Sequence, residues 1–542
     1  MKPRPALRLP LTLVRLGLAG LFALVWSTLV AIAMPVPPTH ILHVASLEIP
    51  AGTDTLTLDV AAPYAHGATE LELWLGEPAH ARLAGRMRIE GTAGDTGVFR
   101  RQSTAFSPDA TGPQRLEVRL PADLPPSNPP PPIAVRAATV SRRGPLHPFL
   151  KTDGIFLKNH HGTGDIVRLR GVNLGGWMLQ ESFMSPIPGG WDEYRLRATL
   201  TRRFGASRAE ELIATFQDAW ITERDFARMA EAGLNCVRLP IYWQNHLHED
   251  GSFKRLPDGS IDFSRIDRAV RDAKRHGLYT ILDLHGAPGS QNGRDHAGDQ
   301  RGPLLWESPH YRAMTKSLWR ELARRYRDEP AVAGYDLLNE PARTSKAKQW
   351  DQLIIDFMGE LYAEVRAVDP AHVVFFSVWS EYPHIGNLTE GKTNYVLAYH
   401  WYIYRRFLDE GGTEADFWHE RVTRHARISR DTYDAPVFIG EFSFKDGPAA
   451  WGDRLEFMTR HGLGWAKWAY KTRAAGLWGL YEARHANDHN IPDPEKDDFA
   501  TIRRKWASWR TEDTFTPDPA VIAALRRAAA LHPPGPVTFP PP

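Results

Sequence analysis

The sequence predicts an α/β protein whose main part is a (β/α)8 barrel. From Phe149 onward, eight apolar, strand-like runs alternate with segments in which apolar residues recur at three- and four-residue spacing, as they do along one face of a helix. Each run is apolar enough to be buried on both faces of a sheet, which is typical of parallel strands. Eight strand–helix units in one domain are typical of a closed parallel barrel.

The predicted strands and helices follow one another in a regular order. The strand-like runs are IVRLRGVNL, NCVRLPIYW, LYTILDLHG, VAGYDLLNE, VVFFSVW, YVLAYHWY, PVFIGEF and LGWAKWAY. Between them lie helical patterns such as ERDFARMAEAG and SRIDRAVRDAKRHG, several of which end in glycine, a common helix stop. An open, doubly wound sheet would need a glycine-rich first turn, but Gly175 and Gly176 form no G-x-G-x-x-G motif. The closed barrel, over residues 149–535, is therefore preferred.

The residues before the barrel predict a second, smaller domain. Residues 40–145 contain short alternating runs, LTLDVAA, LELWL and LEVRLP, separated by Gly, Pro, Asp and Asn, which is typical of a small all-β, sandwich-like domain. A proline-dense piece, residues 120–135, falls near its end and indicates a stiff loop or linker. The domain is either a structural spacer or a carbohydrate-binding module, and the sequence leaves both interpretations open.

Residues 1–34 are predicted to be a signal peptide or a membrane anchor. Basic residues from Lys2 to Arg15 precede residues 16–34, which are uncharged and mostly apolar. At about 1.5 Å rise per residue such a run nearly spans a hydrocarbon core of about 30 Å. Ala31-Ile32-Ala33 also offers a small-residue cleavage site. We expect the rest of the chain to be exported, to the cell envelope, the periplasm or the medium, and to meet a membrane only through this segment.

The composition argues against some classes of function. The formal net charge is +2, so no global field draws the chain to nucleic acid. The one cysteine, Cys236, cannot form an internal disulfide, and its strand-like surroundings favour a buried, inert thiol. The 18 tryptophans exceed ordinary usage and suit a protein that stacks flat apolar rings, although most are expected to pack in the core.

Polar residues stand at one end of the predicted strands. In parallel barrels the active site lies at the carboxyl ends of the strands. A polar residue at a buried strand end costs free energy unless it is paired, so the pattern predicts a functional site. The residues that share this position are Asn173, Arg238, His285, Asn339, Glu340, His400, Tyr402, Glu441 and, within the last run, Trp468.

Two of these residues, Glu340 and Glu441, are carboxylates on different strands. Two carboxylates that face each other across one site can cleave an acetal: one donates a proton to the leaving oxygen and the other attacks the anomeric carbon from the opposite face. A separation of about 5–5.5 Å gives net retention through a covalent intermediate, and a wider gap gives inversion through water. The sequence leaves this distance open.

The motifs DLLNEP and FIGEF, with VRLP, DLHG and YHWY in this order, resemble those of glycoside hydrolase family 5, the large cellulase-type family of retaining barrel enzymes. The resemblance covers roughly residues 150–475. Within the family, GVNLGGWMLQESFMSP, WITERDFARMAEAGLNCVRLPI and DLHGAPGSQNG are similar to the exo-β-1,3-glucanase branch. The resemblance implies Glu340 as general acid/base and Glu441 as nucleophile, with Arg238 and Tyr402 orienting Glu441.

The resemblance also implies a set of sugar-binding residues. Asn339 would hold the sugar 2-hydroxyl, and His285 and His400 would bond sugar hydroxyls or the acid/base. Trp468 would be the platform under the sugar that is cleaved, because an indole face covers the apolar C–H face of a pyranose. Glu181 matches a position that binds hydroxyls of the terminal glucose.

The chain departs from the glucanase pattern after QNG. Arg294 stands where an acceptor-site aromatic residue is expected, and His296 stands where a glucose-binding amide is expected. His296 is therefore a further candidate for substrate binding. A different glucan linkage, or a glycoconjugate, stays open as the substrate.

The sequence thus predicts an exported, retaining glycoside hydrolase that cleaves β-glucosidic bonds in a β-glucan, without a cofactor or a metal. The alternatives are a transglycosylase that uses the same glycosyl-enzyme and a non-catalytic glycan-binding protein. A metal centre made of His285, His400 and Glu340 is a weaker alternative, because such sites usually contain an HxH pair or a further Asp. Linkage, chain length and endo or exo action stay open.

Overall fold

The structure is a computed structural model. It describes residues 41–49, 55–61, 68–75, 82–90, 100–105, 112–119, 134–141, 147–343, 352–379, 385–403, 405–444, 448–473, 476, 478–483, 490–531 and 539. The chain divides into two compact units, Met1–Gly144 and Pro145–Pro542. The predicted signal peptide or anchor lies outside the described residues. Among the residues described, no helix combines the length and apolarity needed to cross a membrane.

The second unit contains a closed barrel of eight parallel strands, as predicted. They are β10 (Arg170–Asn173), β11 (Cys236–Tyr242), β12 (Tyr279–Gly286), β13 (Val332–Asp336), β14 (Val373–Trp379), β15 (Tyr395–Trp401), β16 (Val437–Phe442) and β17 (Gly464–Lys467). Pairing of β10 with β17 closes the barrel. The carboxyl ends of all eight strands therefore meet at one rim.

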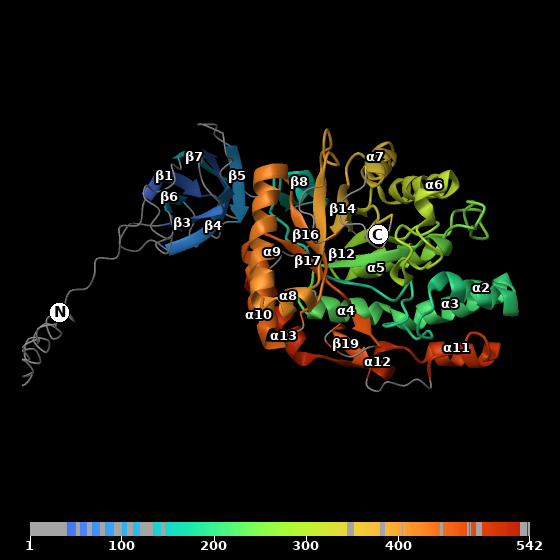
Figure 1. Cartoon of the computed structure of the whole chain (residues 1–542). Helices are drawn as coiled ribbons and strands as arrows, with labels where there is room; N and C mark the ends of the chain where they lie inside the picture. The colour runs from blue at the N-terminus through green and yellow to red at the C-terminus, as the bar shows by residue number, and fades with distance from the viewer. Residues whose placement is uncertain are drawn as a thin grey trace, which may run out of the picture. The chain divides into compact units, whose positions relative to one another are not determined.

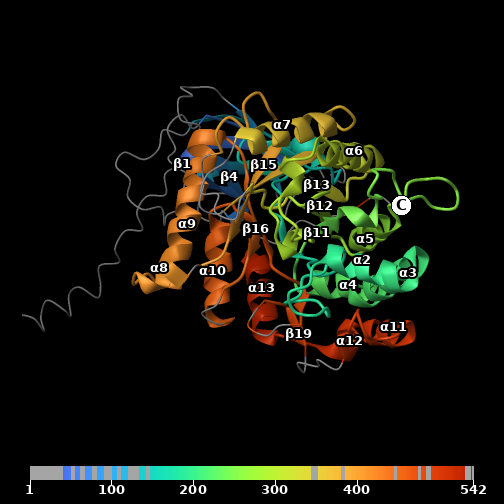
Figure 2. The ribbon, with the colours of Figure 1, turned by 45° about the vertical axis from the view of Figure 1, so that its right-hand side comes forward.

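Helices surround these strands, and Figures 1 and 2 show them on the outside of the barrel unit. They are α2 (Glu193–Phe204), α3 (Ala206–Trp220), α4 (Glu223–Glu231), α5 (Ser264–Arg275), α6 (Pro309–Tyr326), α7 (Gln352–Arg366), α8 (Arg405–Asp409), α9 (Glu414–Ile428), α10 (Pro448–Arg460), α11 (Phe499–Ala507), α12 (Thr511–Thr514) and α13 (Pro519–Leu531). Local signals set several of their starts. A capping box joins Thr222 and Asp225 at the start of α4, and Ser308 accepts from the backbone of Tyr311 at the start of α6.

Short strands complete the unit. A hairpin of β8 (Lys151–Asp153) and β9 (Phe156–Lys158) lies before β10 in the sequence. A second small sheet contains β18 (Lys471–Thr472), β19 (Tyr481–Ala483) and β20 (Phe515–Pro517). It joins the segment after β17 to the segment after α12, so it ties the loop beyond the last barrel strand to the C-terminal part of the unit.

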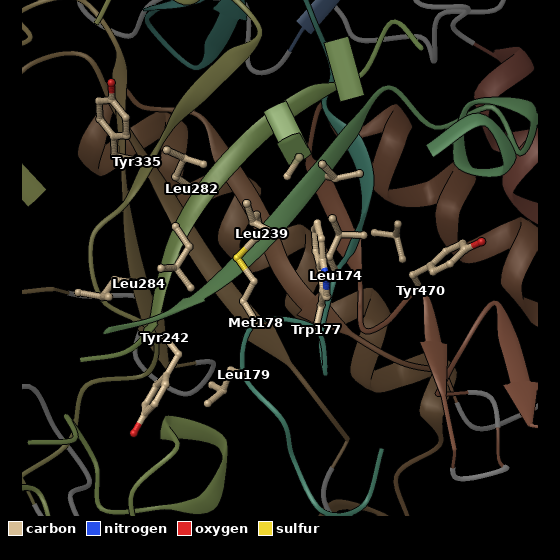
Figure 3. Packing of buried hydrophobic residues seen from close by; sticks show 14 of the residues in the cluster. Leu174, Trp177, Met178, Leu179, Leu239, Tyr242, Leu282, Leu284, Tyr335 and Tyr470 are labelled. Carbon is tan, nitrogen blue, oxygen red and sulfur yellow. The ribbon is translucent and has the colours of Figure 1, made fainter. Parts of the chain in front are cut away.

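The alternation of side chains along each strand separates two apolar layers. One layer packs between strands and helices and includes Leu282 and Leu284, shown in Figure 3, with Leu318 and Leu322 of α6. The other fills the inside of the barrel and contains Cys236, Ile281, Phe375, Val396, Ala398 and Phe438. Cys236 is buried, as expected of a structural thiol.

The same alternation positions the polar site. Arg238 follows the inner residue Cys236 by two positions, and His400 follows the inner residue Ala398 by two. Asp283 and His285 likewise continue the face of Ile281 along β12. The barrel interior is thus apolar toward the amino ends of the strands and polar toward their carboxyl ends, because residues spaced by two along each strand face the same side.

In its described segments, the first unit contains seven antiparallel strands. They are β1 (Ile41–Ile49), β2 (Thr55–Ala61), β3 (Ala68–Leu75), β4 (Arg82–Glu90), β5 (Arg100–Ala105), β6 (Gly112–Arg119) and β7 (Ala134–Ser141). They form a four-stranded sheet in the order β1-β6-β3-β4 and a three-stranded sheet in the order β5-β2-β7. Buried residues of both sheets, such as Leu58 of β2 and Leu73 of β3, belong to one apolar cluster. Most of the proline-dense piece lies outside the described residues.

Candidate active site

Arg238, the third residue of β11, lies at the centre of the polar site and is fully buried. Its guanidinium donates hydrogen bonds to Glu441 Oε1 at 3.0 Å and to Asn339 Oδ1 at 2.9 Å. Its remaining N–H groups donate to Asp336 Oδ2 at 2.9 Å and to Asn173 Oδ1 at 3.1 Å, and one lies 3.0 Å from Asp283 Oδ1. A planar guanidinium with five donors can hold such a set at fixed angles.

Glu441, on β16, is held at both of its carboxylate oxygens. Arg238 donates to Oε1, and the hydroxyl of Tyr402 donates to Oε2 at 2.9 Å. Burial raises the pKa of Tyr402 well above its usual value, and the negative charge of Glu441 adds to this effect, so the hydroxyl keeps its proton and acts as the donor. The carboxylate is thereby fixed in one orientation.

Glu340 follows β13 on a turn in which its own backbone has φ of 43°. His400 Nδ1 lies 2.7 Å from its Oε1, and His296 Nε2 lies 3.4 Å from its Oε2. Burial raises the pKa of Glu340, but the hydrogen bond and charge of His400 outweigh it and lower the pKa. Burial lowers the pKa of His400, and the carboxylates of Glu441 and Glu340 more than reverse this. The short contact therefore joins Glu340 and His400 in one buried, hydrogen-bonded pair.

The two glutamates, remote in sequence, converge on one place. One oxygen of Glu340, one oxygen of Glu441 and one ring nitrogen of His400 all lie within 4.8 Å of one another. His400 Nδ1 lies 3.6 Å from Glu441 Oε1, so the imidazole stands beside both carboxylates. Of the residues in the metal alternative, His285 is absent from this group of close ligand atoms.

His285 is fixed in one tautomer. Its Nδ1 lies 2.7 Å from Asp283 Oδ2, to which it donates, and its Nε2 faces the amide nitrogen of Asn339 at 3.3 Å. Burial lowers the pKa of His285 to about 3, which keeps the ring neutral. The ring stacks on Trp468 with 5.2 Å between centroids and an angle of 14°. Trp468, predicted as a sugar platform, is 4% exposed.

Glu181 lies in the loop between β10 and α2 and is 4% exposed. None of the described residues donates a hydrogen bond to its carboxylate. Burial raises its pKa well above the usual value, and Glu441, Asp295 and Glu340 add to this effect. A buried carboxyl without a hydrogen-bond donor among the residues described can accept a hydrogen bond from a bound hydroxyl or donate one to it.

Several residues that support the site were absent from the sequence-based set. Asp283 and Asp336 hold Arg238, and Gln291 donates to the backbone oxygens of His285 at 2.7 Å and Asn339 at 2.9 Å. Trp478 packs against Tyr402 with 5.8 Å between ring centroids. Asp283, Asp336 and Gln291 lie in the motifs DLHG, DLLNEP and SQNG, which the sequence analysis had already noted. Asp283 also precedes the predicted residue His285 by two positions. Membership of these motifs was the available signal.

Asn173 acts mainly within the barrel. Its side-chain nitrogen donates to the backbone oxygens of Gly440 at 2.8 Å, Ala466 at 3.2 Å and Lys467 at 3.2 Å. It therefore ties the first strand to the last two strands and leaves its Oδ1 for Arg238. Eight of the ten predicted site residues, all but Glu181 and His296, lie on a barrel strand or within four residues after its end.

Comparison with known proteins places the chain among carbohydrate-active proteins. A family model described as cellulase (glycosyl hydrolase family 5) matches residues 202–474. A "Beta-xylosidase" of Phanerodontia chrysosporium is 31% identical over 353 residues, which cover 60% of this chain and 71% of that protein. A "Probable glucan 1,3-beta-glucosidase A" of Emericella nidulans is 31% identical over 365 residues, 64% of this chain and 86% of that protein. Among solved structures, the crystal structure of AoRut covers 58% of this chain and 94% of its own chain at 19% identity, with a TM-score of 0.46.

Proposed function

Because the chain belongs to the cellulase family of glycosyl hydrolases, family 5, we propose that it is a retaining glycoside hydrolase that cleaves β-glucosidic bonds in a β-glucan. The observation that supports retention is the approach of Glu340 and Glu441, whose nearest described oxygens lie within 4.8 Å. Inverting enzymes keep their carboxyl groups about 6.5–9.5 Å apart to leave room for a water molecule, and retaining enzymes about 5–5.5 Å.

In the first step Glu441 attacks the anomeric carbon, and Glu340 gives its proton to the oxygen of the leaving sugar. Arg238 and Tyr402 each donate a hydrogen bond to the attacking carboxylate and hold it in line. The C–O bond to the leaving sugar breaks as the bond to Glu441 forms, which leaves a covalent glycosyl-enzyme.

In the second step a water molecule enters on the side of Glu340. Glu340, now a carboxylate, takes a proton from this water. The water oxygen attacks the anomeric carbon at the same time, and the bond between that carbon and Glu441 breaks. The proton on Glu340 is thereby restored, so one turnover needs no other proton source. A sugar hydroxyl in place of water would give transglycosylation, and product sizing at high donor concentration distinguishes the two outcomes.

Around the reacting carbon, other residues bind the sugar. The amide oxygen of Asn339 accepts a hydrogen bond from Arg238. Its amide nitrogen is therefore available to donate to the sugar 2-hydroxyl or to His285. Glu181 is positioned to bond hydroxyls of the terminal sugar, and the indole face of Trp468 would lie beneath that sugar. The glucan 1,3-beta-glucosidase relatives favour a β-1,3 linkage. A screen of β-1,3, β-1,4, β-1,6 and β-1,2 glucans with sizing of the products tests the linkage and the mode of action.

Replacing Glu340 by Gln is expected to lower kcat/KM on a glucan by about 10²–10⁴-fold, because the amide gives no acidic proton to the leaving sugar. The folded structure should be kept, since Gln has the same shape and His400 can still donate to its oxygen. The measurement is initial rates on purified oligosaccharides for wild type and variant, with thermal melting as the check on folding. Wild-type rates in the variant would remove Glu340 from this role, whereas glycan binding without hydrolysis by the wild type would favour a non-catalytic glycan-binding protein.

Treatment with a chelator is expected to leave the hydrolytic rate unchanged. The proposed mechanism uses proton transfer and a carboxylate nucleophile, and no step needs a Lewis acid. The close approach of Glu340, His400 and Glu441 is nevertheless compatible with a bound cation. Rates before and after dialysis against EDTA, with and without added divalent ions, decide between the two, because a metal hydrolase would lose activity and regain it on metal addition.

The remaining parts of the chain receive roles from their position in the sequence. We assign residues 1–34 to export, as a signal peptide or an anchor, and residues 149–535 to the catalytic barrel. We assign residues 40–145 to a small sandwich-like domain that serves as a spacer ahead of the barrel. Binding of the isolated first domain to an insoluble glucan would replace that assignment by a carbohydrate-binding module.

A further inference from the structure

Lys467 is a fully buried lysine in the last barrel strand, β17, and the proposed mechanism assigns no task to it. Side chains alternate along this strand: Ala466 belongs to the layer inside the barrel, and Trp465 to the layer between strands and helices. Lys467 therefore lies on the outer side, where its Nζ stands 4.9 Å from the ring centroid of Trp451 in α10. Burying a lysine costs free energy, so its polar contacts indicate what it contributes.

Two backbone carbonyls accept hydrogen bonds from this side chain. Its Nζ donates to Trp478 O at 2.7 Å and to Trp468 O at 3.1 Å. Burial lowers the pKa of Lys467 to about 7, and Glu482 and Asp518 act in the opposite direction. Because a neutral amine still has two N–H groups, both bonds can form on either side of this value. One side chain thus joins two segments of the loop that follows β17.

Backbone hydrogen bonds add to this junction. The N–H of Ala469 donates to Trp478 O at 2.6 Å, and the N–H of Leu480 donates to Ala469 O at 3.2 Å. Among the described residues, Lys467 is the one that donates to the carbonyl oxygen of Trp468. The backbone of Trp468 is therefore tied to the backbone of Trp478 through the lysine.

Each of the joined segments carries a tryptophan ring of the polar site. Trp468, the proposed sugar platform, stacks on His285 with 5.2 Å between ring centroids. The ring of Trp478 lies 5.8 Å from the ring of Tyr402, whose hydroxyl orients the proposed nucleophile. Tyr402 and Trp478 both pack against the small apolar cluster to which Trp468 belongs. Lys467 thus holds, from outside the barrel, the backbones that carry two rings of the site.

We propose, on the basis of the function proposed above, that Lys467 is a positioning residue that sets the spacing between the rings of Trp468 and Trp478, and thereby the fit of the glucose ring that is cleaved. It acts through the two backbones that it joins. Trp468 supports the apolar C–H face of the pyranose, and this contact is made in the ground state and in the transition state alike. A change in the spacing therefore weakens binding more than it slows the chemical step.

Replacing Lys467 by Met removes both donors and keeps the length of the side chain. A thioether chain suits the apolar surroundings, and Trp478 O keeps its bond from Ala469, so the fold should be retained. On a β-linked glucose disaccharide, whose leaving sugar makes the first step slow, KM is expected to rise by about 5- to 10-fold, while kcat changes by less than about 2-fold. On 2,4-dinitrophenyl β-glucoside, kcat/KM should fall by a similar factor, because the same glucose occupies the platform.

Lys471 of β18 gives a matched control, because it is a second fully buried lysine on the same loop. Its Nζ donates to Trp509 O at 3.1 Å and to Thr511 Oγ1 at 3.0 Å, in the C-terminal part of the unit. Its described contacts do not include the two rings held by Lys467. Lys471→Met removes a buried cation whose charge acts on Asp225, so it should lower the melting temperature and leave KM within about 2-fold of wild type.

A double-mutant cycle tests whether Lys467 acts through Trp478. Trp478→Ala should raise KM by itself, and it leaves Lys467 without a second ring to hold against Trp468. In this background, Lys467→Met is expected to change KM by less than about 2-fold. All variants are assayed below the lowest melting temperature among them. If Lys467→Met does not fold, Lys467→Gln takes its place with the same expected rise in KM, because its side chain is one atom shorter and cannot reach both carbonyls.

An unchanged KM in Lys467→Met would overturn the proposal. An equal rise of KM in Lys471→Met would also overturn it, because that result indicates general loosening of the loop, and so would a full additional rise in the Trp478→Ala background. A wild-type chain that cleaves neither substrate would instead overturn the proposed function itself, before any variant is compared.

Discussion

Replacing Glu441 by Gln should lower kcat/KM on every active substrate by about 10⁴-fold or more, the largest effect expected of a single change in this chain. An amide oxygen is a poor nucleophile, so the glycosyl-enzyme does not form. In contrast to Glu340→Gln, the loss should be equally severe on 2,4-dinitrophenyl β-glucoside, because a good leaving group does not replace the attacking carboxylate. Initial rates on both substrates give the comparison.

A matched control for this variant is Glu390→Gln, a Glu on the surface of the same unit. It should hydrolyse at the wild-type rate. A second check is Glu441→Ala with added azide, a small anion that fits the space left by the carboxyl group. Azide should restore turnover and give a product of inverted configuration, since the attack now comes from solution. Restored turnover with retained configuration would show that another group is the nucleophile.

Replacing Arg238 by Met should cost both stability and activity. The side chain is fully buried, and its removal leaves the carboxylates of Asp283, Asp336 and Glu441 near one another without a counter-charge. Breaking a buried charge pair in this way costs about 3–5 kcal/mol, because the partner stays buried and unpaired. Denaturant unfolding at several pH values measures the loss, and initial rates measure the loss of the oriented nucleophile.

The pH dependence of that variant has a definite sign. Burial raises the pKa of Asp283 to about 7 in the native chain, against the lowering effect of Arg238. Without Arg238 the pKa rises further, so the folded chain binds this proton more tightly than the unfolded chain does. Stability of the variant should therefore fall as the pH rises from about 4 through 7 and beyond.

The control for Arg238→Met is Arg327→Met, because Arg327 pairs with Asp328 on the surface. Its unfolding midpoint should match wild type at each pH, since exposed pairs contribute little. If Arg238→Met unfolds at the same midpoint as this control, the guanidinium is not compensating the three carboxylates, and the proposed arrangement of the site would need revision.

Much of the barrel could be predicted from the sequence, because its strands are recognisable as apolar runs of nearly constant length. The polar residues at their ends could be predicted for the same reason. The contacts of Arg238 with Asp283 and Asp336 could not, because they depend on which side of β12 and β13 faces inward. That choice is set by the register between strands, and Asp283 and Asp336 read in the sequence as ordinary members of apolar runs.

The contact between His296 and Glu340 was also beyond the sequence. His296 stands in a loop whose path is set by backbone bonds such as that from Ala342 N–H to Gln291 O, which brings the two loops together. No periodic pattern encodes such a contact. The departure of His296 from the family pattern marked the position as unusual, but its place 3.4 Å from Glu340 follows only from the folded path of these loops.

Arg170, at the start of β10, has a consequence for how the chain is made. Its guanidinium is buried and donates at 3.1 Å to the carbonyl oxygens of both Ala528 and Ala529, in the last turn of α13. These acceptors are 358 and 359 residues downstream. During synthesis on the ribosome, the guanidinium of Arg170 therefore lacks these two hydrogen-bond acceptors until nearly the whole chain has been translated. The seam of the cylinder is therefore expected to close only after translation of the final helix, which leaves the early strands dependent on chaperones until then.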